Sequence, residues 1–227
     1  MTSILCIIPA RCGSKGIIDK NIKLYKDKPL IAWSIEQAKK CKHKMRIIVS
    51  TDSEIYATIA KTYGAEVPFI RPSEISGDLS LDIEFMHHCV NWLETNENYK
   101  SDIILQLRAT SPLRKISDIN NALDIFLQVR SNYDSLRSVI EIEKSPYKMY
   151  NVINDNLTPL FKSVNGINEV YNQCRQVLPK CYLHNGYIDI FNTTILSQNT
   201  ISGEKIYPYI MNENDNNDID NYTDWIE

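Results

Sequence analysis

The chain of 227 residues predicts an α/β fold in which helices cover both faces of a mostly parallel sheet. Two observations indicate this class. Short apolar runs alternate with amphipathic segments along most of the chain, and the first run is continuously apolar, as in a strand buried on both faces. In such folds ligands bind beyond the carboxyl ends of the strands. The length suits one domain spanning residues 1–227.

The first strand and helix follow each other closely. Residues 4–8 form the opening apolar run, which predicts a strand. Pro29 then opens a segment at residues 30–40 whose apolar side chains are spaced for one helical face and whose end carries cations. This segment is expected to be the first helix.

A second strand and helix repeat the pattern. Residues 46–51 predict a strand, and Asp52 and Ser53 can cap the helix that follows it. That helix is expected to run to Tyr63 and to end at Gly64, where left-handed backbone geometry is needed.

Apolar spacing assigns the remaining elements. Strands are expected at residues 66–70, 103–107, 135–142, 185–191 and 205–211, and helices at residues 80–94 and 116–130. Residues 144–181 carry prolines, asparagines and Gly166 with little helical periodicity, so they predict a hairpin-like excursion from the sheet. Such an excursion is rarely stable alone in water, and we expect it to fold over the site or to pack on a second subunit.

Composition limits the class of protein. The net charge of −3 gives no basic field for nucleic acid, and no apolar run is long enough to span a membrane. The opening run is too short, and too uncharged on its amino side, for a signal peptide. Six scattered cysteines without a C-x-x-C pair predict reduced thiols and a cytoplasmic protein.

The turn after the first strand predicts a phosphate site. Gly13 and Gly16 permit backbone N–H groups to converge on an anion, while Arg11, Lys15 and Lys20 supply positive charge. The turn matches neither the G-x-x-x-x-G-K-[ST] order of a P-loop nor the G-x-G-x-x-G order of a dinucleotide site. The alternative is a basic surface turn, which would leave the gathering of cations unexplained.

Other charged residues lie where this architecture places its site. Arg108 follows the strand at residues 103–107, and Arg71 follows the expected strand at residues 66–70. A guanidinium in such a position suits a carboxylate or a phosphate. Asp218 and Asp220 alternate in an extended segment, so both carboxylates can meet one Mg²⁺ ion. A solvated acidic tail would give the same pattern.

Seven motifs in order carry a family resemblance. They are Ile8-Pro9-Ala10-Arg11 with Gly13-Ser14-Lys15-Gly16 and Lys20-Asn21, Val49-Ser50-Thr51-Asp52, Arg71-Pro72-Ser73-Glu74, Thr110-Ser111-Pro112-Leu113-Arg114, Arg175-Gln176-Val177-Leu178-Pro179, Asn185-Gly186 and Asp218-Ile219-Asp220. The set resembles the acylneuraminate cytidylyltransferases, which make CMP-activated sialic acids and related nine-carbon sugars. The resemblance implies a Rossmann-like nucleotidyltransferase fold.

The resemblance also implies roles for single residues. The expected phosphate contacts are Arg11, Ser14, Lys15 and Lys20, the expected cytosine contacts are Asn21 and Arg71, and Ser80 is expected to line the nucleotide pocket. Asp218 and Asp220 are implied as the magnesium carboxylates, and Arg11, Lys20 and Asp218 as the catalytic residues. The expected sugar contacts are Lys148, Arg175 and Asn185, with the excursion reaching in from the partner subunit of a homodimer.

Arg108 departs from the sialic acid pattern, in which glutamine is usual at this position. Together with Ser145-Pro146-Tyr147-Lys148-Met149 it is more similar to the branch that activates legionaminic acid-type sugars. We therefore include Arg108 among the expected sugar contacts. The resemblance implies a magnesium-dependent enzyme that joins CMP from CTP to the anomeric hydroxyl of a nonulosonic acid and releases pyrophosphate. The alternatives are activation of another sugar acid, such as an octulosonate, and a catalytically silent nucleotide-binding homologue.

Overall fold

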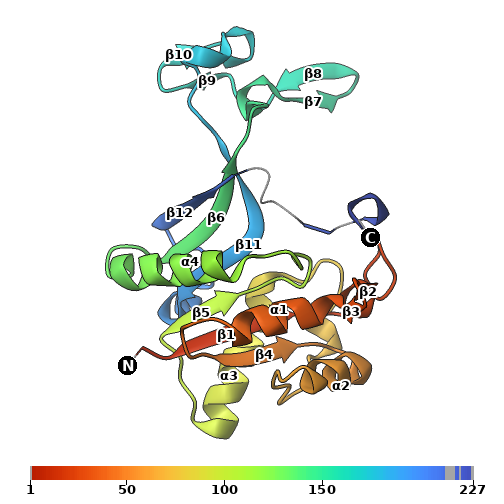
Figure 1. The fold of residues 1–227 in the computed structure, drawn as a ribbon. Coiled ribbons are helices and arrows are strands. Elements are labelled where there is room, and N and C mark those ends of the chain that lie inside the picture. The colour runs from red at the N-terminus through yellow and green to blue at the C-terminus, as the bar shows by residue number, and fades with distance from the viewer. Residues whose placement is uncertain (1, 213–217, 220, 226–227) are drawn as a thin grey trace.

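Six strands form the central sheet, in the order β12-β6-β11-β5-β1-β4 (Figure 1). The computed structural model describes residues 2–212, 218–219 and 221–225. The sheet strands are β1 (Ile4–Pro9), β4 (Arg46–Ser50), β5 (Ile103–Gln106), β6 (Ser135–Glu141), β11 (Tyr182–Asn192) and β12 (Ile206–Met211). Pairs β1–β4, β1–β5 and β6–β12 are parallel, whereas β11 runs antiparallel to both β5 and β6. The expected mostly parallel sheet is confirmed.

Helices cover both faces of the sheet, as predicted. They are α1 (Leu30–Lys39), α2 (Glu54–Thr62), α3 (Asp82–Glu97) and α4 (Ile116–Val129). On β1, Cys6 and Ile8 face a core shared with α1, α2 and α4, whereas Leu5 and Ile7 face a core shared with α3 and the 3₁₀ helix η6 (Thr193–Gln198). Burial on both faces explains the unbroken apolar run. Within the described ranges, no helix combines the length and apolar character needed to cross a membrane.

The expected strand at residues 66–70 is wrong. Glu66 makes an isolated parallel bridge to Ile48, and the chain then leaves the edge strand β4. The physical reason is Pro68, which has no N–H to donate to a sheet ladder. One further hydrogen bond, from Arg71 N to Thr51 O at 2.7 Å, returns the chain to the end of β4. Arg71 thereby lies at the carboxyl end of β4 although it does not follow a strand of its own.

Residues 144–181 form an arm of two hairpins that projects from the ends of β6 and β11 (Figure 1). The first pairs β7 (Tyr150–Ile153) with β8 (Asn156–Pro159), and the second pairs β9 (Ser163–Val164) with β10 (Ile167–Asn168). Asn154 and Asp155 both have positive φ, which the tight turn of a two-residue hairpin requires. The predicted hairpin character of this segment is confirmed.

Smaller elements complete the chain. A short hairpin joins β2 (Leu24–Tyr25) to β3 (Lys28–Pro29). Further 3₁₀ helices among the described residues are η1 (Lys20–Ile22), η2 (Ser73–Ile75), η3 (Pro146–Lys148), η4 (Val170–Asn172), η5 (Arg175–Val177) and η8 (Tyr222–Asp224). Of these, η1 and η2 contribute Lys20, Asn21 and Ile75 to the same pocket lining as Pro9 at the carboxyl end of β1, where a ligand site is expected.

Arg114, in the loop between β5 and α4, ties the sheet to α1. Its guanidinium is buried and donates to the carbonyl of Tyr187 at 2.7 Å and to that of Arg108 at 2.8 Å. It also donates to Gln37 Oε1 at 2.9 Å and to Ser34 Oγ at 3.1 Å, both on α1. Burial lowers the pKa of Arg114 to about 10, so the guanidinium stays charged and needs these acceptors.

We expect Arg114→Met to lower the free energy of unfolding by about 3 kcal/mol, because it leaves several buried acceptors without a donor. Urea unfolding followed by circular dichroism measures the change. The matched control is Arg175→Met at an exposed arginine, where we expect a change within about 0.5 kcal/mol. Equal stability of the two variants would show that the Arg114 contacts do not hold the fold together.

Candidate active site

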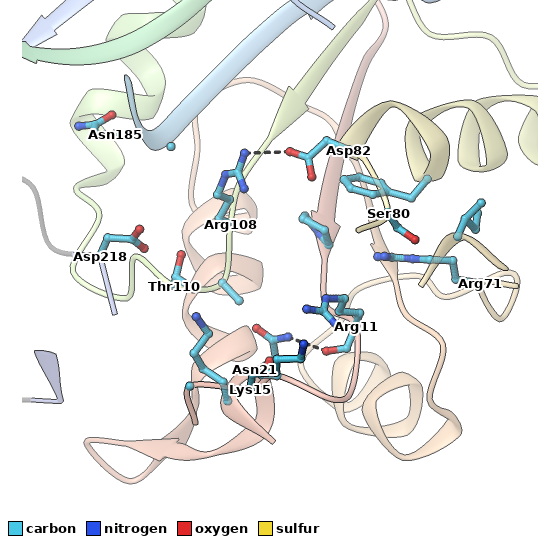
Figure 2. Close-up of a pocket in the computed structure, with 18 of the residues that line it drawn as sticks. Arg11, Lys15, Asn21, Arg71, Ser80, Asp82, Arg108, Thr110, Asn185 and Asp218 are labelled. Carbon is cyan, nitrogen blue, oxygen red and sulfur yellow. Dashed lines mark hydrogen bonds and ion pairs between the residues drawn. The ribbon is translucent and has the colours of Figure 1, made fainter. Parts of the chain in front are cut away.

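A pocket of about 520 Å³ lies at the carboxyl ends of β1 and β5 (Figure 2). Its walls come from the loop after β1, the segment between Arg71 and Phe85, the loop after β5, the first part of β11, and Asp218. In Figure 2, Arg11, Lys15 and Asn21 lie on one side of the pocket, and Arg108, Asp82 and Asn185 lie on the opposite side. The pocket therefore has a cationic end and a mixed polar end.

The loop after β1 forms the cationic end. Arg11, Ser14, Lys15 and Lys20 all line the pocket, and Gly13 has a φ of +74°, which favours glycine. The buried amide of Asn21 donates to the carbonyl of Arg11 at 3.0 Å and holds the loop in shape. Lys20 donates to the carbonyl of Ile219 at 3.1 Å, which joins the loop to the carboxyl-terminal segment. This arrangement suits a polyanion.

Asp78 already occupies part of this cationic end. Its carboxylate lies 2.9 Å from Arg11 Nη2 and 2.5 Å from Lys15 Nζ. Hydrogen bonds from Lys15 and then from Arg11 lower the pKa of Asp78, so the group is an anion at neutral pH. Both cations are thus held by a carboxylate of the same chain.

Arg71 and Ser80 close the side of the cationic end next to α3. Arg71 is buried, donates from Nε to Ser50 Oγ at 3.0 Å and also bonds the Ser50 carbonyl. Its guanidinium carbon lies 4.7 Å from the ring centre of Phe85. Burial lowers the pKa of Arg71 to about 10, and the group remains a cation. Its fixed position makes it a rigid donor in the pocket wall.

Arg108 and Asp82 form the polar end. Arg108 Nη2 donates to Asp82 Oδ2 at 2.8 Å, and Gln106 Nε2 donates to the same oxygen at 2.9 Å. Gly186, with a φ of +64°, packs against this guanidinium, and a Cβ there would stand 3.0 Å from Arg108 Nε. Asn185 is held by a hydrogen bond of 2.6 Å from Ser138 to its Oδ1. The guanidinium of Arg108, a donor, and the carboxylate of Asp82, an acceptor, thus stand side by side in this wall.

Asp218 brings a carboxylate to the wall between the two ends. The backbone N–H of the next residue, Ile219, donates to the carbonyl of Thr110 at 2.8 Å, so the carboxyl-terminal segment is fixed to the loop after β5. Asp220 lies outside the described residues. Among the residues described, no three His, Cys, Asp or Glu side chains form a cluster that could hold a metal by themselves.

Most of the predicted site residues meet in this pocket. They are Arg11, Ser14, Lys15, Lys20, Asn21, Arg71, Ser80, Arg108, Asn185 and Asp218. Lys148 and Arg175 do not line it, because they lie in η3 and η5 of the arm. The individual roles of all these residues stay predictions.

The sequence reasoning did not single out Asp78, Asp82 and His184, which also belong to the site. Asp78 pairs with two of the predicted phosphate ligands, Asp82 pairs with Arg108, and His184 lines the pocket beside Asn185. Their positions in the sequence could have indicated this role: the two acids flank Ser80, and the histidine directly precedes the Asn-Gly motif. Asp82 is the first residue of α3, and an acid at the start of a helix is usually explained by its interaction with the helix dipole. Its place in the helix therefore did not by itself indicate a role in the site.

Comparison with known proteins decides the family. The sequence profile of the cytidylyltransferases matches residues 5–166. The chain belongs to the cytidylyltransferase family. It is a nucleotidyltransferase, as its sequence predicts.

Curated relatives agree with this assignment. The chain is 37% identical over 228 residues to post-translational flagellin modification protein B of Campylobacter coli, and 33% identical to CMP-N,N'-diacetyllegionaminic acid synthase of Campylobacter jejuni; each match covers 99% of this chain and 93% of the relative. It is 34% identical to N-acylneuraminate cytidylyltransferase of Escherichia coli, of which it spans 51%.

Solved structures confirm the fold of this cytidylyltransferase. CMP:2-keto-3-deoxy-manno-octonic acid synthetase in complex with CTP matches with a TM-score of 0.69, over 98% of this chain and 95% of that one. A cytidylyltransferase from Leptospira borgpetersenii matches with a TM-score of 0.62, over 99% of this chain and 84% of that one. At 15% and 17% identity these matches show the Rossmann-like nucleotidyltransferase fold alone.

We expect Asp78→Asn to tighten binding of inorganic pyrophosphate to this cytidylyltransferase by about two- to fivefold, because the anion no longer competes with a carboxylate for the half-buried Arg11 and the exposed Lys15. Isothermal titration calorimetry measures the affinity. Asp124→Asn is the matched control, since Asp124 lies 2.5 Å from Lys42 on another surface. Weaker pyrophosphate binding by Asp78→Asn would mean instead that Asp78 positions the cations for the ligand.

Proposed function

We propose that this cytidylyltransferase transfers CMP from CTP to the anomeric hydroxyl of a nonulosonic acid, a nine-carbon keto-acid sugar, and releases pyrophosphate. Relatives 32–37% identical to it are named for N-acylneuraminate, N,N'-diacetyllegionaminic acid and pseudaminic acid. The observation that carries the proposal is the single pocket in which a cationic end adjoins a polar end. A triphosphate and a sugar acid require these two environments side by side.

At the cationic end, Arg11, Ser14, Lys15 and Lys20 bind the triphosphate of CTP. Asn21 and Arg71 contact the cytosine, and Ser80 lines the nucleotide pocket. Support for these roles comes from the rigid mounting of Asn21 and Arg71, which are both buried and hydrogen-bonded to backbone carbonyls. Base recognition needs donors and acceptors that are fixed before the ligand arrives.

Mg²⁺ is the proposed cofactor, held by Asp218 and Asp220 together with phosphate oxygens. The donor set fits, because Mg²⁺ takes hard oxygen ligands and usually keeps waters and substrate phosphates rather than a full protein cage. Asp218 lines the pocket between its two ends, where such an ion would meet both substrates. When bound, the ion neutralises phosphate charge.

The reaction needs no covalent enzyme intermediate. The chain's own groups hold the sugar hydroxyl in line with the α-phosphorus, which removes much of the entropy cost of a two-substrate reaction. Arg11 and Lys20 stabilise the negative charge that builds on the departing pyrophosphate. Both side chains line the cationic end of the pocket.

At the polar end, Arg108 and Asn185 contact the sugar acid. Lys148 and Arg175 lie on the arm and do not line the pocket of their own chain. In the homodimer, the partner subunit's Lys148 and the partner subunit's Arg175 complete the sugar pocket. The exposed apolar side chains of the arm support this assembly: Val152 and Leu157 stand opposite each other on β7 and β8, and each is more than two-thirds exposed.

We place the enzyme in the cytoplasm, with no nucleic acid or membrane as a partner. All six cysteines are free thiols, which suits a reducing compartment. Cys6 and Cys89 are buried in the two cores, and burial raises the pKa of each thiol, so these two act as small apolar side chains.

Two alternative functions are not favoured. The octulosonate enzyme shares the fold at 15% identity, whereas relatives at 34% and 33% identity are named for N-acylneuraminate and N,N'-diacetyllegionaminic acid. A silent nucleotide-binding homologue would have no need for a sugar end with paired Arg108 and Asp82.

A pyrophosphate-release assay tests the function directly. Each of the four nucleoside triphosphates is combined with N-acetylneuraminic, N,N'-diacetyllegionaminic and pseudaminic acids and with a 3-deoxy-octulosonic acid. We expect turnover with CTP and at least one nonulosonic acid. Preference for the octulosonate, or no turnover with any pair while CTP still binds, would contradict the proposal.

We expect Arg108→Gln to shift the ratio of kcat/KM values toward N-acetylneuraminic acid, relative to the preferred sugar, by about tenfold. The reason is that one charge-assisted hydrogen bond is exchanged for a neutral one. Arg108→Lys serves as the control that keeps charge without the planar fork. Equal losses for both sugars would assign Arg108 to the phosphates or to the fold.

We expect a homodimer at micromolar concentration whose interface includes the arm. Leu157→Asp should give a monomer with reduced activity, because it places a charge in an apolar contact that forms between the two subunits. Light scattering measures the mass. Ile55→Asp, at another exposed apolar residue, is the control and should leave the dimer intact. A wild-type monomer with full activity would refute the assembly.

A further inference from the structure

A polar row crosses the sheet next to the sugar end of the pocket. Gln106 on β5 stands opposite Asp189 on β11, and Asp189 stands opposite Arg137 on β6. Residues directly opposite one another on neighbouring strands project from the same face of a sheet. Ile7 of β1 continues the row and lies in the core under α3. The row therefore places charged groups in a layer that is otherwise apolar.

The row is only partly satisfied by the chain itself. Gln106 Oε1, Arg137 Nε and Arg108 Nε are buried, and none has a hydrogen-bond partner among the residues described. Arg137 Nε lies 3.5 Å from Asp189 Oδ1, which allows charge attraction but not a good hydrogen bond. Folded proteins leave few buried polar atoms unpaired, and Arg108 is the one of these three residues that lines the pocket, so its Nε indicates that this wall suits a polar ligand.

His184 connects this row to the pocket. The register of β11 against β6 shifts between His184 and Asp189, and such irregularities commonly redirect side chains beside active sites. His184 lines the pocket next to Asn185 and Gly186, and its side chain is one-third exposed. Its Nε2 atom lies 2.8 Å from Oδ1 of the buried Asp189.

The carboxylate determines what the imidazole offers to the pocket. A neutral histidine beside a carboxylate carries its proton on the nitrogen that faces the carboxylate, here Nε2. The other nitrogen, Nδ1, then has a free lone pair and accepts hydrogen bonds. Arg137 Nε lies 3.5 Å from the same oxygen, Asp189 Oδ1, and lowers the cost of burying the negative charge.

We propose that His184, oriented by Asp189, is a specificity-determining residue for the sugar acid. Its Nδ1 accepts a hydrogen bond from a donor group on the sugar, either the N–H of an acylamino substituent or a hydroxyl. Arg108 donates to an oxygen of the same sugar from the neighbouring wall. Asp189 is a positioning residue that acts through His184. The inference rests on the proposed function and deepens it by naming the chemistry at the sugar end.

The test uses His184→Gln in the full-length protein. A glutamine Nε2 can still donate to Asp189, but with Nε2 in that place the acceptor Oε1 projects from the opposite edge of the side chain and no acceptor stands where Nδ1 was. We expect the KM for N-acetylneuraminic acid at saturating CTP to rise about tenfold, with a smaller change in kcat and CTP affinity within twofold of wild type. His87→Gln, on α3 outside this pocket, is the matched control and should leave every parameter unchanged.

Asp189→Asn provides a second variant, since it keeps the shape but permits either tautomer of the imidazole. We expect it to raise the KM for the sugar without affecting CTP binding. A sugar analogue with a hydroxyl in place of the acetamido group identifies the donor. A smaller penalty of His184→Gln on the analogue assigns the contact to the amide N–H, and an equal penalty assigns it to a hydroxyl.

The outcomes separate this inference from the proposed function. If wild type turns over a nonulosonic acid and neither variant changes the KM for the sugar, the role of His184 is refuted while the function stands. If His184→Gln weakens CTP and sugar equally, His184 supports the pocket as a whole and the inference is also refuted. If wild type turns over no nonulosonic acid, the proposed function fails and the inference fails with it.

Discussion

The pocket depends on the buried guanidinium of Arg114. It bonds the backbone carbonyls of Arg108 and Tyr187, so it joins the loop after β5 to β11 at the point where both contribute side chains to the polar end. Its contacts with Gln37 and Ser34 add α1, the helix that follows the cationic loop. A charge buried among neutral acceptors tolerates little displacement, because each lost acceptor exposes the desolvation cost. The two ends of the pocket are thereby held at a constant separation.

Antiparallel β11 gives the pocket its second wall. In a fully parallel sheet only loops that leave strands would reach this edge. Here the first residues of β11 arrive at the carboxyl end of β5, which adds Asn185 and Gly186 to the wall opposite the phosphate loop. The sheet can therefore combine a nucleotide site of the usual parallel kind with a polar wall built from a strand.

Local patterns were enough to predict the helices, the buried strands and the cationic loop, because burial on both faces and helix capping leave direct marks in the sequence. The resemblance supplied residues such as Ser80 and Asn185, whose positions depend on tertiary folding. The strand predicted at residues 66–70 is wrong, because the prediction relied on the apolar residues there and gave too little weight to Pro68. The pairing of Asp78 with the loop could not be predicted, since it joins segments 67 and 63 residues apart, and no local rule reports such contacts.

The arm and the pocket share two strands. Beyond the register shift near His184, β11 no longer pairs with β5 and keeps only β6 as a neighbour, and these two strands lead into both hairpins (Figure 1). A strand with one neighbour is held less firmly than a strand inside a sheet, and the irregular register is the point where it can bend. A force on the hairpins therefore reaches the polar wall directly through β6 and β11, whereas it reaches the loop after β1 only across β5. The two ends of the cavity thus differ in how directly movement of the arm can act on them.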